Sequence, residues 1–225
     1  ATRGQGTAPT NMGRGVVANL TGHAFGYIGT GNFIQRNGNT LATMQQLQRE
    51  RGHFYNWYDT RTLLPLHPAY ISTVDSGNLA AHLLTLQAGL LQLSRQSLVG
   101  AQVFSGIRDT ATILRASRTV VPSTLLARFE RGIDNFGAQP LTACATDAAL
   151  QQLLEVADEI AELADSADAG EGQRWAQALQ RQCRDAAEEW RELLPWLSLR
   201  RAGARVAWAI ESIRMAWMPD VARLG

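Results

Sequence analysis

The chain has 225 residues, of which 45% are hydrophobic, and its 21 basic and 20 acidic residues leave a net charge of +1. This length suits one large or two small domains, and the apolar content is sufficient for a hydrophobic core. The near balance of charge excludes a global basic field of the kind that attracts nucleic acid. No apolar run of about 18 residues is present, so we predict no membrane span.

The beginning of the chain has neither an initiator methionine nor the hydrophobic core of a signal peptide. We therefore interpret the chain as a piece of a longer protein. Residues 1–9 are rich in glycine and threonine and are expected to be flexible. Cys144 and Cys183 match neither a CxxC motif nor a metal-ligand spacing. We expect both to be free, reduced core thiols of a cytosolic protein.

Helical periodicity begins early in the chain. Thr10 or Asn11 can cap a first helix, in which apolar residues recur every four positions and which ends near residues 26–29. A second helical pattern includes residues 41–47. The preceding Asn37-Gly38-Asn39 is a poor helix interior and predicts that this helix starts late or is broken there.

Residues 52–82 form the stretch that is richest in chemistry, GHFYNWYDTRTLLPLHPAYISTVDSGNLAAH. Pro65 and Pro68 argue against a helix between about residues 62 and 70. We expect the turn residues Ser76-Gly77-Asn78 to precede an apolar helix that continues to Leu93, with Asp75 or Ser76 as its cap.

The rest of the chain predicts further helices. Asp109 is a candidate cap for a short helix through Ala116, and Pro122 suits the first turn of the next one. Residues 150–164 and 175–193 predict an antiparallel hairpin.

A last helix is predicted to stop at Pro219, with an apolar face made of Val206, Ile210, Ile213 and Trp217. No convincing alternating strand pattern is present. The predicted class is therefore all-α, made of helical hairpins with one long aromatic and acidic loop.

That loop has the composition of a carbohydrate site, because sugars need flat aromatic rings for stacking and planar polar groups for their hydroxyls. Tyr55 and Trp57 are candidate stacking platforms. The candidate polar contacts to substrate are His53, Asn56, Asp59, Arg61, Asp75 and Asn78. The alternative is a structural loop whose aromatics close the end of a helical bundle, with Asp59 and Arg61 paired locally and Asp75 a helix cap.

Catalytic and metal chemistry have weaker support in the sequence. Glycoside chemistry usually needs two carboxylates across the scissile bond, and Asp59 and Asp75 are the only acids in the loop. Their spacing does not show whether they face one another, so the catalytic residues stay unassigned. His53, His67 and His82 match no ligand spacing. We predict no metal and no cofactor.

Three segments together resemble a known family. APTNMG at 8–13, RGHFYNWYDTRTLLPL at 51–66 and YISTVDSGNLAAHLL at 70–84 are similar to the opening of the glucoamylase-like domain of bacterial cyclic β-1,2-glucan synthases. The resemblance extends over roughly residues 8–95. It implies part of an (α/α)6-toroid-like array of helices, in which the loop lines the sugar cleft through residues 54–59 and through Ser72, Thr73 and Asp75.

The resemblance also implies a larger context. These synthases are inner-membrane enzymes that make β-1,2-glucan from UDP-glucose, and their middle domain is linked to ring closure by transglycosylation. This chain would be soluble and would lie at the cytoplasmic face of that membrane as part of the parent protein. Its domains would be a flexible segment 1–9, a glucan-facing part 10–140, and a helical hairpin with a terminal helix 141–225.

The principal catalytic acids of that domain are expected to follow residue 225, so the chain alone is expected to be inactive. Its expected partners are β-1,2-glucan and the remaining domains of the synthase. An open half-toroid also exposes helix faces, so the chain can self-associate.

Two functions therefore compete. The first is a segment of the synthase that binds β-1,2-glucan through the loop, with Asp59 and Asp75 orienting sugar hydroxyls. The alternative is a non-catalytic helical scaffold that positions the other domains. A free-standing glycoside hydrolase is disfavoured by the short length and the missing start.

Overall fold

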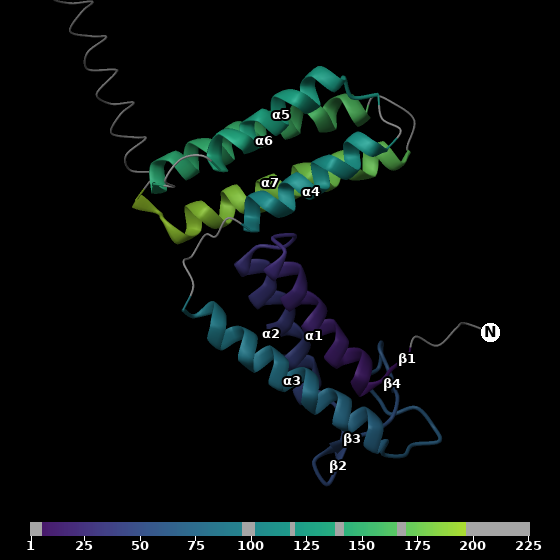
Figure 1. The fold of residues 1–225 in the computed structure, drawn as a ribbon. Coiled ribbons are helices and arrows are strands. Elements are labelled where there is room, and N and C mark those ends of the chain that lie inside the picture. Colours follow the sequence, from purple (N-terminus) through teal and green to yellow (C-terminus); the bar gives the residue numbers. More distant parts are fainter. Residues whose placement is uncertain (1–5, 96–101, 118–119, 138–141, 166–169, 197–225) are drawn as a thin grey trace, which may run out of the picture.

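The computed structural model describes residues 6–95, 102–117, 120–137, 142–165 and 170–196. Helices dominate this part of the chain and the strands are only two residues long, which confirms the predicted all-α class (Figure 1). The helices are α1 (Pro9–Ala24), α2 (Thr30–Gln46), α3 (Thr73–Leu93), α4 (Gln102–Ala116), α5 (Ser123–Gly137), α6 (Ala143–Asp165) and α7 (Glu171–Leu193). The strands are β1 (Gly6–Thr7), β2 (Arg49–Glu50), β3 (His53–Phe54) and β4 (Tyr58–Asp59).

The helices associate in two groups (Figure 1). In the first, α1 packs against both α2 and α3 around the buried side chains of Val16, Phe33 and Leu86. In the second, α4 to α7 enclose a larger core that includes Phe129 and Leu179. The toroid-like arrangement and the domain division after residue 140 stay predictions.

Small residues let α1 and α3 approach closely. A Cβ at Gly13 would lie 2.5 Å from Nδ1 of His82, and a Cβ at Gly89 would lie 2.6 Å from a methyl carbon of Leu20. Along α1, the residues Thr10, Gly13 and Leu20 meet Asp75, His82 and Gly89 of α3 in the same order. The helices α1 and α3 therefore run parallel.

The second group is a bundle of antiparallel neighbours. Asp165, the last residue of α6, accepts hydrogen bonds from Gln173 and Gln177 of α7. Asp158, which lies earlier in α6, accepts from Gln180 and Arg184, which lie later in α7. This reversed order confirms the predicted hairpin of α6 and α7. Exposed pairs of this kind add little stability, so the buried apolar core supplies most of it.

The two cysteines differ in their surroundings, and neither forms a disulfide. Cys183 lies fully buried in the bundle, where burial and the nearby charge of Asp158 raise the pKa of its thiol. Cys144 is exposed near the start of α6, so its expected place in the core was wrong. Its neighbours Thr146 and Ala149, rather than Cys144, lie on the buried face of that helix.

The first helix and the segment before it differ from prediction. Residues 1–5 lie outside the described part, but Gly6 and Thr7 pair with Asp59 and Tyr58 and are therefore not a free tail. Helix α1 begins at Pro9 after Ala8, because proline has the backbone angle of a first helical residue. The hydroxyl of Thr10 bonds Asp75 on α3 instead of capping α1, so the predicted cap was wrong.

Helix α2 is continuous through residues 37–39, where a late start or a break was predicted. Tertiary packing outweighs the weak helix propensity here. Asn37 is 5% exposed, and its Oδ1 accepts a hydrogen bond of 2.9 Å from Asn19 on α1. Gly38 faces open space on the outer side.

The predicted starts of the next helices also need correction. Helix α4 begins at Gln102, seven positions before the predicted cap Asp109, because the buried Phe104 and Ile107 anchor its first turns. The carboxylate of Asp109 accepts instead from the hydroxyl of Tyr27 at 3.1 Å. Pro122 lies directly before α5. The predicted helix at residues 206–217 lies outside the described residues.

Candidate functional site

The aromatic loop contains a short extended segment, residues 55–59, whose side chains alternate between two sides. Asn56 and Tyr58 are buried, whereas Trp57 is 42% exposed and its neighbours Tyr55 and Asp59 are half-buried. This alternation is the period of a strand. It divides the predicted site residues into a structural set and an outward-facing set.

Tyr58 anchors the inner side of the loop. Its side chain is 0% exposed, and its hydroxyl donates to the carbonyl oxygen of Gln48 at 2.7 Å. The same hydroxyl accepts a hydrogen bond of 2.8 Å from the backbone N–H of Tyr55. Burial raises the pKa of Tyr58, so the phenol stays protonated and keeps both bonds.

Asn56 has a similar structural role. Its backbone N–H donates to the carbonyl of Tyr70 at 2.8 Å, and its Oδ1 accepts from the backbone N–H of Tyr70 at 3.4 Å. Asn56 is buried at 5% exposure, so its side chain is not offered to a ligand. These bonds hold the two sides of the loop together.

Trp57 lies on the outer side, and its position is defined by contacts to the chain on either side. Its carbonyl accepts from the N–H of Leu66 at 2.9 Å. A Cβ at Gly6 would lie 3.1 Å from the indole, so the ring packs close to β1. Tyr70, on the segment that bonds Asn56, is 55% exposed. The loop therefore presents two aromatic side chains on a hydrogen-bonded frame.

Asp59 closes the tip of the loop. Its Oδ1 accepts from the N–H groups of Arg61 at 2.8 Å and Thr62 at 3.0 Å, which is an Asx-type turn. These bonds to the backbone hold the pKa of Asp59 below its usual value. No ion pair between Asp59 and the guanidinium of Arg61 is found among the described residues.

Asp59 also borders a groove of about 290 Å³. The groove lies between the loop and the first two helices and is lined mainly by apolar groups, among them Met12, Met44, Leu47 and Leu63. Of the residues expected to line the sugar cleft, only Tyr58 and Asp59 are in its wall. The aromatic and polar residues named from the sequence therefore do not converge on this groove.

Asp75 lies inside the first turn of α3, and Ser72 caps that helix. The Oγ of Ser72 accepts from the N–H of Asp75 at 3.1 Å. The predicted caps Asp75 and Ser76 were therefore wrong, and the turn predicted at residues 76–78 is helical. Only a Ser-x-x-Asp reading of residues 72–75 would have located this cap.

The carboxylate of Asp75 connects α3 to α1. Oδ1 of Asp75 accepts a hydrogen bond of 2.5 Å from the hydroxyl of Thr10, which accepts in turn from Nδ2 of Asn78 at 3.2 Å. The hydroxyls of Thr10 and Ser72 hold the pKa of Asp75 below its ordinary value of 3.8. Neither Thr10 nor Tyr70 was among the predicted site residues, because only folding brings them to the loop.

This depressed pKa predicts a pH dependence of stability. The stabilising effect of Asp75 is fully present above pH 3.8, its unfolded value, and is lost as the pH falls through its lower folded value. We expect Asp75→Asn to be less stable than the wild type at pH 7, with the difference shrinking towards acid. Urea unfolding of both proteins, from neutral pH into the acid range, measures this difference in the free energy of unfolding.

The difference between the free energies of unfolding of the two proteins at each pH does not contain the similar contribution of Asp59, whose pKa is also lowered. A stability difference that stays constant down to the acid limit would contradict this assignment of Asp75.

The remaining predicted contacts, His53, Arg61, Thr73 and Asn78, are exposed. The structure places His53 in the β2–β3 pair, Arg61 at the loop tip, and Thr73 and Asn78 on the first turns of α3. Within the described ranges, no three His, Cys, Asp or Glu side chains gather into a metal site.

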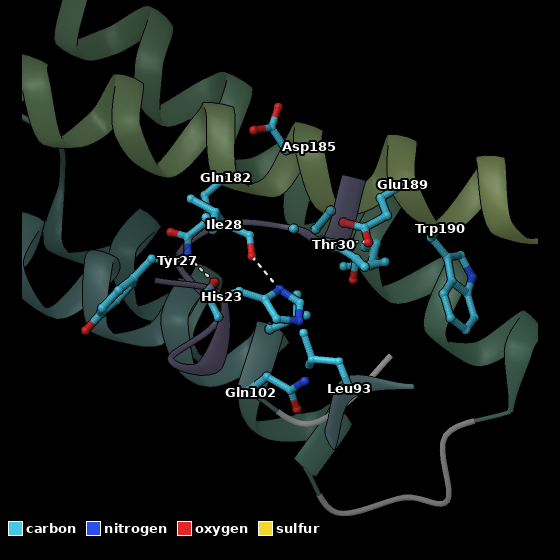
Figure 2. A pocket seen from close by; sticks show the side chains of 15 residues that line it. His23, Tyr27, Ile28, Thr30, Leu93, Gln102, Gln182, Asp185, Glu189 and Trp190 are labelled. Carbon is cyan, nitrogen blue, oxygen red and sulfur yellow. Dashed lines mark hydrogen bonds between the residues drawn. The ribbon is translucent and has the colours of Figure 1, made fainter. Parts of the chain in front are cut away.

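A second cavity, of about 90 Å³, lies between the two helix groups and is lined by residues of both (Figure 2). The α1–α2 connection reaches the bundle here. Glu189 of α7 accepts from the N–H of Thr30 at 2.8 Å, and Gln182 donates to the carbonyl of Gly26 at 2.9 Å. The carboxylate of Glu189 thus satisfies a donor at the otherwise uncapped start of α2.

Comparison with curated proteins finds a relative of about half of the chain. The chain is 38% identical over 117 residues to the cyclic β-(1,2)-glucan synthase NdvB of Rhizobium meliloti (strain 1021). The resemblance to cyclic β-1,2-glucan synthases is confirmed. The match covers 52% of this chain and about 4% of NdvB, so it concerns a small part of that synthase.

No protein-family model matches the chain. Among the described residues, no helix combines the length and the apolar character needed to cross a membrane.

Proposed function

We propose that this chain is a helical segment of a cyclic β-1,2-glucan synthase and that it binds β-linked glucan on the outer side of the aromatic loop. The similarity to NdvB supports the first part of the proposal. The exposed indole of Trp57 supports the second part. Its partners in this proposal are the glucan and the remaining domains of the synthase.

Trp57 is the observation that carries glucan binding. The exposed indole is a large flat apolar surface that a ligand can cover, and here it is held by a paired backbone. A pyranose ring offers its apolar C–H face to such an indole. Tyr70 presents a second exposed ring on the neighbouring segment.

The polar residues fall into two roles under this proposal. Arg61 and Asn78 are exposed donors that suit sugar hydroxyls. Asp59 and Asp75 already accept hydrogen bonds from their neighbours, so their main role is to shape the loop that presents Trp57. No catalytic residue is assigned, and ring closure by transglycosylation is proposed for the parent synthase rather than for this chain.

The second candidate is a scaffold that positions other domains of the synthase. The buried residues Asn56 and Tyr58 favour the scaffold function, because their side chains form hydrogen bonds with the backbone of Tyr70 and Gln48 rather than facing a ligand. The position of the loop also fits this function, since it lies at the end of the first helix group that is remote from the bundle (Figure 1).

Calorimetric titration of the full chain with linear β-1,2-gluco-oligosaccharides separates the two functions. We expect saturable binding that weakens about tenfold or more in Trp57→Ala, which corresponds to about 1.4 kcal/mol. The matched control is Trp196→Ala, which removes an indole of similar exposure from the segment that follows α7. Circular dichroism of each variant shows whether it is folded.

Equal weakening in both variants, or binding that survives Trp57→Ala, would contradict the proposed surface. A folded wild-type chain that does not bind the oligosaccharides would favour the scaffold.

A further inference from the structure

One face of α3 is both apolar and exposed. It consists of six residues that all lie exposed, namely Val74, Gly77, Ala81, Leu84, Ala88 and Leu91. Val74, Leu84 and Leu91 expose 70%, 65% and 57% of their surface. Successive members are alternately three and four positions apart, which is the heptad period of helices that pack side by side. We call these six residues the α3 outer face.

The opposite side of α3 is already packed. Leu79 and Leu86 are buried, and Gly89 contacts Leu20 of α1. The helix is thus apolar on two sides, and it lies at the edge of the first helix group (Figure 1). Helices that are apolar all round are normally buried all round, so the α3 outer face is a surface on which a further helix can pack.

The α3 outer face carries no charge. The only ionisable side chains of α3 are Asp75 and His82, and both meet residues of α1. Neutral polar side chains are exposed elsewhere on the helix, among them Thr85, Gln87 and Gln92. Two copies of this face can therefore meet without bringing like charges together, which would otherwise oppose their association.

The α3 outer face is also complementary to a reversed copy of itself. In a pair of helices related by a two-fold axis, a residue that contacts a second residue is contacted by it in turn. In one antiparallel register Val74 faces Leu91, Gly77 faces Ala88, and Ala81 faces Leu84, so all six residues find an apolar partner. The small residues let the two helices approach closely.

We propose that two copies of this chain associate through their α3 outer faces as an antiparallel helix pair. A parallel pair would place Leu84 opposite a second Leu84 and Gly77 opposite a second Gly77, whereas the antiparallel register sets large residues against small ones at the centre. The antiparallel direction also separates the α4–α7 bundles, which follow the C-terminal end of α3 (Figure 1). One helix pair is smaller than a standard interface of about 800 Å² per partner, so we expect a micromolar dissociation constant.

Sedimentation equilibrium of the full chain, up to about 200 μM, tests this association. Leu84→Arg places a charge of each copy near the two-fold axis and should raise the dissociation constant of the dimer at least about tenfold. The matched control is Ile34→Arg, which places the same charge on α2 at an aliphatic residue that is 60% exposed. The control should dimerise like the wild type, and circular dichroism shows whether each variant is folded.

Three results would overturn the proposal. A wild-type chain that stays monomeric up to about 200 μM would leave the α3 outer face to a different partner. A dimer that survives Leu84→Arg, or one that both variants weaken equally, would show that another surface holds the two copies.

Cross-linking tests the direction of the pair. Cys144→Ser removes the exposed native thiol, while Cys183 stays buried. In this background Val74→Cys and Leu91→Cys are made in separate chains, mixed, and treated with a short bis-maleimide. Links between unlike chains should exceed links between like chains at least about fivefold, because two copies of position 74 lie about 26 Å apart in the antiparallel pair. An excess of links between like chains would overturn the antiparallel arrangement.

Discussion

Gly26→Ala should lower the free energy of unfolding by about 2–4 kcal/mol, which is a large effect for one methyl group. Gly26 has a φ of +75°, where a side chain is strained. A Cβ at this position would lie 1.9 Å from the carbonyl oxygen of Gln102, at the start of α4. Backbone must therefore move, and the contact between the two helix groups must loosen.

Gly38→Ala is the matched control for this prediction. Gly38 lies inside α2 with nothing within 4 Å of its added Cβ, so alanine should stabilise the protein by about 0.5–1 kcal/mol through helix propensity. Urea unfolding of both variants measures the two changes in the free energy of unfolding, which should have opposite signs. A Gly26→Ala protein as stable as the wild type would show that the α1–α2 connection does not pack on α4 in solution.

The second large effect is expected at Tyr58. Removing its buried ring in Tyr58→Ala should cost about 3–5 kcal/mol through lost burial and the cavity left behind. Tyr58→Phe keeps the ring but leaves the carbonyl of Gln48 and the N–H of Tyr55 without their shared partner. Loss of hydrogen bonds at partly buried positions costs about 0.5–1.5 kcal/mol each, so this variant should be intermediate.

Tyr70→Phe is the control, because Tyr70 is 55% exposed and its substitution should change stability by at most about 0.5 kcal/mol. Urea unfolding followed by near-ultraviolet circular dichroism reports the loop aromatics and the global transition together. If Tyr58→Phe matched Tyr70→Phe, the hydroxyl of Tyr58 would not be the anchor of the loop.

The glucan-binding proposal depends on this anchor. Trp57 and Tyr58 are adjacent in the chain but point to opposite sides of the loop. Tyr58 holds the frame from within, and Trp57 is left for a ligand. A Tyr58 variant that loses glucan binding would therefore report a lost loop, whereas Trp57→Ala tests the contact itself.

Hydrophobic periodicity in the sequence alone predicted the all-α class and the α6–α7 hairpin. In long helices such as α6 the apolar residues repeat every three or four positions, and that repeat needs no knowledge of the partner. Helix ends were less predictable. Thr10 and Asp109 have good capping side chains, but each forms a hydrogen bond with a distant part of the chain instead.

The candidate site shows the same division. Sequence by itself identified the aromatic and polar loop and its resemblance to cyclic β-1,2-glucan synthases, because composition and motif order are properties of one segment. Only the tertiary structure decided that Asn56 and Tyr58 face inward while Trp57 faces solvent. That choice depends on Gln48 and Tyr70, whose backbone groups reach the loop only after the chain has folded, and no local pattern encodes such distant hydrogen bonds.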